Sequence, residues 1–205
     1  MIAERHAELT AYVTAHQEEI VCGERIILFV DECFLLWGDA CGYVWGKRDE
    51  RVTVPVGNIR QRQAYYGAVD MVTGTTHLVP YDTANALSTT DFLLDLQLRF
   101  PNTKLTIIWD NASHHKAAAV RDYLAAVNAG LSEEDWPITC RWFAPHDPSQ
   151  NPIEDIWNQA KTFVRQQWAK LTSFQDVTTA FERFLAGQVF DFPKLHRYCP
   201  DLQMI

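Results

Sequence analysis

Three acidic residues stand where a protein could hold a metal ion. Asp31 and Asp110 each end an apolar run, and Glu154 falls in the first turn of a helix expected from Pro152. The carboxyl ends of strands form the edge at which open α/β sheets place their chemistry. Carboxylates crowded at such an edge repel one another and raise each other's pKa values unless a cation neutralises them. We therefore expect Asp31, Asp110 and Glu154 to bind divalent metal.

Magnesium suits this set of ligands, because it prefers oxygen and keeps several waters. Two such ions about 4 Å apart can activate an attacking hydroxyl and stabilise the leaving oxygen of a phosphodiester. The acids thus predict phosphoryl transfer with two Mg²⁺ ions per site and Mn²⁺ as a substitute. We expect Asp31→Asn or Asp110→Asn to abolish cleavage and to leave the metal-free fold as stable or more so.

Glu154 also has a purely structural interpretation. Asn151 followed by Pro152 is typical of a helix N-cap and first helical position, and Glu154 then occupies the capping-box position. The two roles are compatible, because a carboxylate that caps its own helix meets a metal in a fixed rotamer. Asp155 is an alternative ligand, although it points about 100° round the helix.

The elements that must position these acids alternate between strands and helices. Hydrophobic periodicity and turn residues predict strands at 25–32, 64–72, 75–79, 104–111 and 138–143, a further strand within 43–56, and helices at 2–19, 88–100, 116–130, from 152 and at 173–187. Thr73 and Gly74 form the expected hairpin turn, and Ser88 the expected cap of its helix. Strand alternation places Glu32 on the face opposite Asp31.

Composition fits one globular domain, with 47% hydrophobic and 12% aromatic residues in 205. No apolar run has membrane-spanning length and no signal peptide is apparent, so a cytoplasmic location is expected. Five cysteines without a CxxC pair indicate neither a disulfide framework nor a zinc site. The net charge of −8 argues against a surface that grips nucleic acid everywhere.

One segment, residues 47–62, is nevertheless basic, with a local charge of +3. It is either a solvated hairpin or a patch that follows a phosphate backbone. The candidate DNA contacts are Lys47, Arg48, Arg51, Arg60 and Arg62, together with Lys161 and Arg165 on the helix that carries Glu154.

Five polar residues flank the acids and could support them without binding metal. They are Glu32, Asn111, His114, His115 and Asn151. Asn111 is expected to orient Asp110 or to cap the helix from Ser113. The histidine pair could assist at the metal or contact phosphate, but a structural or exposed role is the commoner use of such histidines.

Three motifs together resemble one family. FVDE at 29–32, WDNASHH at 109–115 and NPIEDIW at 151–157 are similar to the catalytic domain of mariner-superfamily DDE transposases, in the bacterial insertion-sequence branch. The order of elements likewise resembles the ribonuclease H-like fold, an α/β fold with a mixed five-stranded sheet flanked by helices. This resemblance implies that Asp31, Asp110 and Glu154 are the catalytic, metal-binding triad.

The resemblance also implies a function and partners. It implies DNA cleavage followed by strand transfer in cut-and-paste transposition, with terminal inverted repeats and TA-containing targets as DNA partners, and a homodimer acting on paired ends at the nucleoid. We expect a linker or docking helix at 1–24, the catalytic domain at 25–187 and a tail at 188–205. We expect a catalytic domain without the N-terminal helix-turn-helix domain of complete family members.

Two other functions remain open. The chain could be a catalytically silent DNA-binding or oligomerisation remnant of a transposase, although all three acids are intact. It could instead be another ribonuclease H-like nuclease, such as a junction resolvase, which NPIEDIW does not favour.

Overall fold

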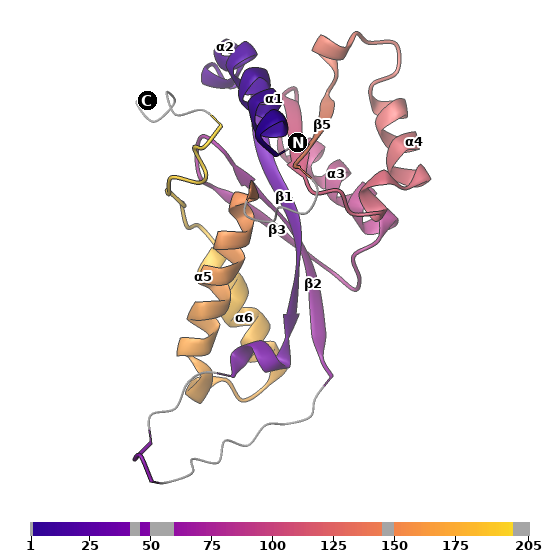
Figure 1. Cartoon of the computed structure of the whole chain (residues 1–205). Coiled ribbons are helices and arrows are strands. Elements are labelled where there is room, and N and C mark those ends of the chain that lie inside the picture. The colour runs from indigo at the N-terminus through magenta and orange to yellow at the C-terminus, as the bar shows by residue number, and fades with distance from the viewer. Residues whose placement is uncertain (1, 42–45, 50–59, 145–149, 199–205) are drawn as a thin grey trace.

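The structure, a computed structural model, describes residues 2–41, 46–49, 60–144 and 150–198. One five-stranded sheet of order β3-β2-β1-β4-β5 has helices on both faces (Figure 1). The strands are β1 (Arg25–Leu36), β2 (Arg62–Asp70), β3 (Thr76–Tyr81), β4 (Lys104–Trp109) and β5 (Ile138–Trp142). The helices are α1 (Ile2–Ala15), α2 (Gln17–Val21), α3 (Ala86–Arg99), α4 (Ala118–Val127), α5 (Pro152–Gln166) and α6 (Phe174–Leu185).

The sheet is mixed, as predicted. β1, β2 and β3 pair antiparallel, whereas β1, β4 and β5 pair parallel. The last pair between β1 and β4 joins Phe29 to Ile108. Asp31 and Asp110 each lie two residues beyond that pair, so the register brings them to the same level of the sheet.

β1 is longer than predicted, because the acids at 31 and 32 do not end it. The strand continues to Leu36, which pairs with Arg62 of β2. Cys33 and Leu35 are buried in the core beneath α5 and α6, and this burial keeps the strand extended past the two charges. Asp31 and Glu32 therefore lie within a strand and not at its end.

Each face of the sheet has its own core, and β1 contributes to both. Ile27 and Phe29 pack with α1, α5 and α6 on one face, while Leu28 and Val30 pack with α3 and α4 on the other. Figure 1 shows α5 and α6 together on one side and α3 and α4 on the other. The two-residue period therefore holds, and it assigns Asp31 to the α5 face and Glu32 to the α3 face.

Two helix starts differ from the sequence prediction. α3 begins at Ala86, because the side-chain oxygen of Asn85 accepts hydrogen bonds from the backbone N–H groups of Leu87 and Ser88. Ser88 is therefore not the cap. α4 begins at Ala118, after a 3₁₀ turn at His114–Lys116. The strand expected within 43–56 lies largely outside the described residues.

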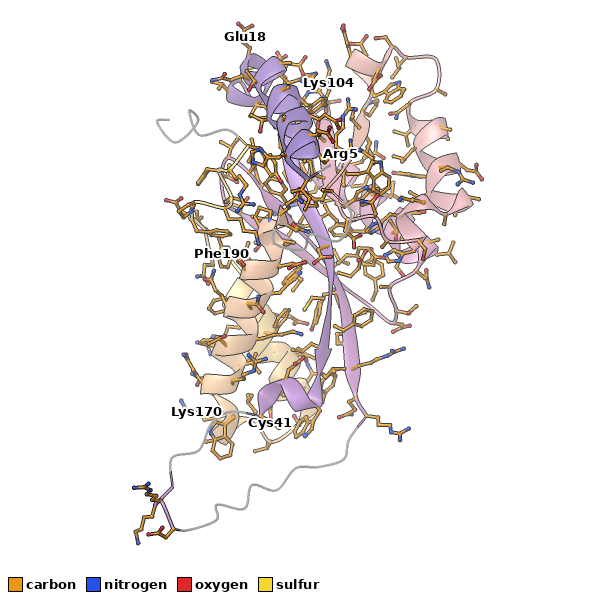
Figure 2. The ribbon with its side chains drawn as sticks, in the orientation of Figure 1. Arg5, Glu18, Cys41, Lys104, Lys170 and Phe190 are labelled. Atoms are coloured by element: carbon orange, nitrogen blue, oxygen red, sulfur yellow. The ribbon has the colours of Figure 1, made fainter. Side chains whose placement is uncertain are left out.

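Arg25, the first residue of β1, connects the N-terminal helices to the sheet. It is only 1% exposed. Its guanidinium donates to Glu19 at 2.6 Å and to the Tyr12 hydroxyl at 3.0 Å. Lys104, labelled in Figure 2, adds a second contact to Glu19 at 3.4 Å. Among the described residues, no helix is long and apolar enough to cross a membrane.

Candidate active site

The start of α5 is attached directly to β1 beside Asp31. Asn151 accepts from the backbone N–H of Ile153 at 3.4 Å, which confirms the predicted cap. Its amide nitrogen also donates to the carbonyl of Val30, the residue before Asp31, at 3.3 Å. Asn151 is 3% exposed, so both bonds are shielded from water. This residue therefore brings the first turn of α5, and Glu154 with it, to the level of Asp31.

Asp31 lies among the other acids. Its pKa is raised well above the usual range, first by burial and then by the negative charges of Glu32, Glu154 and Asp110. In contrast, the hydrogen bond from His115 lowers the pKa of Asp110, and the Ala112 N–H adds to this effect. Ionised Asp31 therefore destabilises the fold, whereas ionised Asp110 stabilises it.

This difference leads to separate predictions for the two variants. Asp31→Asn should leave the metal-free fold more stable, as predicted. Asp110→Asn should instead make the fold less stable, because the amide cannot replace a carboxylate that is held by His115.

Glycine at position 67 allows α5 to lie against the sheet. Gly67 pairs with Asp31 across β1 and β2. A Cβ atom there would stand 2.2 Å from Cη2 of Trp157 and 3.3 Å from Cδ1 of Ile153. Because Gly67 has no side chain, Ile153 and Trp157, which lie before and after Glu154 on α5, pack directly against the backbone of β2. The sequence carries a signal for this contact, because a glycine inside a strand often marks the close approach of another backbone or side chain.

His115 and Glu32 form a second polar group on the opposite face of β1. Burial alone would raise the pKa of Glu32, but hydrogen bonds from His114 and His115 lower it to about 2. Burial alone would lower the pKa of His115, but hydrogen bonds and charges from Asp110 and Glu32 raise it to about 9. At neutral pH the group is therefore an imidazolium between carboxylates.

The ligand atoms of Glu32, His114 and His115 lie within 4.8 Å of one another, closely enough to hold a metal ion. Two imidazoles and one carboxylate suit transition metals better than magnesium. In the described part of the chain, the oxygens of the three acids are spread more widely than this group. Mutual repulsion of carboxylates favours such spreading.

Other predicted residues have structural partners. The Asn111 amide donates to the Phe143 carbonyl at 2.9 Å and its oxygen accepts from Lys116 at 2.9 Å, so Asn111 does not cap the following helix. Asp155 pairs with Lys194 at 3.3 Å. Lys161 donates to the Phe34 carbonyl at 2.9 Å and lies 3.3 Å from Asp39.

The remaining candidate DNA contacts fall in two groups. Lys47, Arg48, Arg60 and Arg62 are exposed, and Arg165 is partly exposed in the last turn of α5. Arg51 lies outside the described residues. No described contact brings any of these residues to the acids.

Residues 26–178 match the family described as DDE superfamily endonuclease. The chain belongs to the DDE superfamily endonucleases. This match confirms the family that the three motifs indicated. No curated protein shows a significant match.

Solved structures similar to this DDE endonuclease include the Mos1 mariner paired-end complex with Mn, with a TM-score of 0.61, 18% identity and coverage of 96% of this chain and 57% of that one. The Mos1 transposase catalytic domain with raltegravir and Mg has a TM-score of 0.57 and 16% identity, with coverage of 96% of this chain and 91% of that one. A further structure, of the catalytic domain of Mos1 mariner transposase, has a TM-score of 0.55 and 15% identity, with coverage of 96% of this chain and 84% of that one. The likeness confirms the expected ribonuclease H-like fold, and the DDE endonuclease spans 57% of the chain in the paired-end complex.

Proposed function

We propose that this DDE endonuclease is the catalytic domain of a transposase that cuts and joins DNA strands with divalent metal held by Asp31, Asp110 and Glu154. The carrying observation is the crowding of acids around Asp31, whose pKa is raised first by burial and then by the charges of Glu32, Glu154 and Asp110. Family membership supports nuclease chemistry. The Mos1 structures, described as transposase complexes with a transposon end and with Mn or Mg, support the substrate and the cofactor.

The residues fit a hard divalent cation. All three proposed ligands offer carboxylate oxygen, which Mg²⁺ and Mn²⁺ accept. Asp110 is 55% exposed and can therefore meet a substrate. A bound cation would remove the repulsion that raises the pKa of Asp31. When bound, two such ions would supply activation of the attacking oxygen and stabilisation of the leaving oxygen.

The chain's own contribution is to hold these oxygens in place. Asn151 fixes α5 against β1, and the Ala112 N–H fixes Asp110 at 2.9 Å. Such placement is the main part of phosphoryl-transfer catalysis, because little covalent chemistry is asked of the protein.

Two reactions would follow at this site. In the first, water forms a bond to the phosphorus at the transposon end, the bond to the 3′ oxygen breaks, and that oxygen leaves as a hydroxyl after taking a proton. In the second, the freed 3′-hydroxyl attacks a target phosphodiester and releases another 3′-hydroxyl. The number of ester bonds is unchanged in the second reaction, so no energy source is required. We also propose terminal inverted repeats, TA-containing targets and a homodimer on paired ends.

The test is metal-dependent melting of the full chain. At a hundred times its Kd, a ligand that binds only the folded state adds about 2.7 kcal/mol, or roughly 5 to 10 °C for a protein of this size. We expect Mn²⁺ to raise Tm in the wild type but not in Asp31→Asn or Glu154→Gln. Asp155→Asn is the matched control, since it removes an acid one residue away that is paired with Lys194.

A response retained in Glu154→Gln and lost in Asp155→Asn would move the third ligand to Asp155. No response in the wild type would refute the proposed site and favour the catalytically silent remnant. Nicking of supercoiled plasmid with Mn²⁺ then tests the chemistry, and a preference for branched over linear DNA would favour a junction-resolving nuclease instead.

A further inference from the structure

His115 lies between two carboxylates, Glu32 within β1 and Asp110 just after β4. Its Nδ1 lies 3.1 Å from Oδ1 of Asp110 and hydrogen-bonds the backbone carbonyl of the same residue at 3.3 Å, and its Nε2 is 2.8 Å from Oε1 of Glu32. Carbonyl oxygens and ionised carboxylates only accept hydrogen bonds, so both ring nitrogens must donate. The side chain has no exposed surface, so water does not compete for either bond.

The packing around the His115 ring fixes its position, so the ring can in turn fix the position of Asp110. It stacks on Trp109, the last residue of β4, with centroids 4.3 Å apart and planes 8° apart. Glu32 is fixed in the middle of β1 by pairing with Tyr66 of β2. The bridge thus links the centre of the sheet to Asp110, which lies beyond the last β1–β4 pair and is half exposed.

The bridge also selects one oxygen of Asp110. Both His115 and the Ala112 N–H approach Oδ1, the latter at 2.9 Å. Among the described residues, no donor approaches Oδ2. The carboxylate is therefore oriented through one oxygen and keeps the other for a cation.

We infer that His115 is a positioning residue, anchored on Glu32, that orients Asp110 so that Oδ2 can bind the catalytic cation. This inference rests on the proposed function. His114 donates to the same oxygen of Glu32 at 3.0 Å but makes no contact with Asp110, so it is not part of the bridge.

The experiment measures Mn²⁺ affinity of the full chain by electron paramagnetic resonance, with circular dichroism to verify folding. In His115→Asn the amide nitrogen occupies the place of Nδ1, and in His115→Gln that of Nε2. Loss of an outer partner of a metal ligand weakens metal affinity by roughly 10- to 100-fold. We expect this loss in His115→Gln, a smaller loss in His115→Asn, and a clearly smaller loss in His114→Gln than in His115→Gln.

The control is His77→Asn. His77 also pairs with a carboxylate, Asp95, and stacks on a ring, Phe92, at 6.0 Å, but it lies on β3. This variant should lose stability and keep its Mn²⁺ affinity.

Each alternative role of His115 gives a different result. A purely electrostatic role predicts tighter Mn²⁺ binding in both His115 variants, because a positive charge is removed. A purely structural role predicts unchanged affinity. Either result overturns the inference. A loss in His114→Gln equal to that in His115→Gln would place the cation on Glu32, His114 and His115 and would overturn it as well.

The proposed function can be judged separately in the same series. Wild-type binding that is lost in Asp31→Asn supports the acidic site even if the His115 variants behave as wild type. Absence of Mn²⁺ binding by the wild type would refute both.

Discussion

Gly67 offers a way to displace Glu154 without changing any acidic residue. A Cβ at this position would stand 2.2 Å from Cη2 and 2.7 Å from Cζ2 of Trp157. Carbon atoms pack at about 3.5 to 4.0 Å, so the indole must retreat by roughly 1.5 Å. Ile153 blocks part of the path, because its Cδ1 would be 3.3 Å away. The strain in Gly67→Ala must therefore be relieved partly by movement of α5.

The size of the effect follows from this geometry. Overpacking a core costs about 1 to 3 kcal/mol, and Trp157 is only 6% exposed, so we expect Gly67→Ala to lose about 2 kcal/mol. Glu154 lies between Ile153 and Trp157 on α5 and moves with them. Because misplacement by about 1 Å can reduce a rate about 100-fold, plasmid nicking should fall by more than the stability loss explains.

The assay is urea unfolding of Gly67→Ala, Trp157→Phe and the double variant. Phenylalanine lacks the outer ring edge that meets the new methyl group, so the double variant should be more stable than the sum of the two single losses predicts. Gly38→Ala is the control, since nothing lies within 4 Å of a Cβ there. Additive losses, or a Gly67→Ala variant as stable as the wild type, would refute the argument that this contact sets the position of α5.

Three further predictions concern other contacts. Lys161→Met should lower unfolding stability by about 1 kcal/mol in thermal melts, because it breaks the bond to the Phe34 carbonyl; a loss of DNA affinity with stability unchanged would restore Lys161 as a DNA contact. Arg25→Met should cost about 2 kcal/mol in urea, because it removes the hydrogen bonds of a buried guanidinium to Glu19 and Tyr12, although Lys104 still pairs with Glu19; a loss below 1 kcal/mol would contradict this. The pKa of His115 is raised from 6.5 to about 9, so its protonation adds about 3 kcal/mol to the free energy of unfolding. This stabilisation is complete below pH 6.5 and is lost as the pH rises through 9. Urea unfolding in EDTA across this pH range should show the loss of stability in the wild type but not in His115→Asn.

The proximity of Asp31 and Asp110 could be predicted because both follow apolar runs that pair as parallel neighbours, although Asp31 lies within its strand and only Asp110 follows one. The cap of α5 could be predicted from Asn151 and Pro152, whose local roles depend little on the rest of the fold. The extent of β1 could not be predicted, because the burial that carries it past Asp31 comes from α5 and α6, far along the chain.

Other details depend on contacts that spacing does not encode. A histidine pair in the sequence does not reveal that one ring nitrogen of His115 meets Asp110 and the other meets Glu32. Ser88 had the correct spacing for a cap, yet Asn85 offers its oxygen to two N–H groups and begins the helix earlier. In each case a competing partner, present only in the folded chain, decided the outcome.

The parallel pairing of β1 with β4 has a consequence for how the protein becomes active. β2, β3 and α3 all lie between these strands in the chain, and α5 follows only after β5. Contacts between such distant segments form slowly, because the loop between them must close before any pairing is gained. A chain still emerging from the ribosome would therefore carry Asp31 long before Asp110 and Glu154 could join it. The proposed metal site is thus complete only when β4 and α5 have both joined β1.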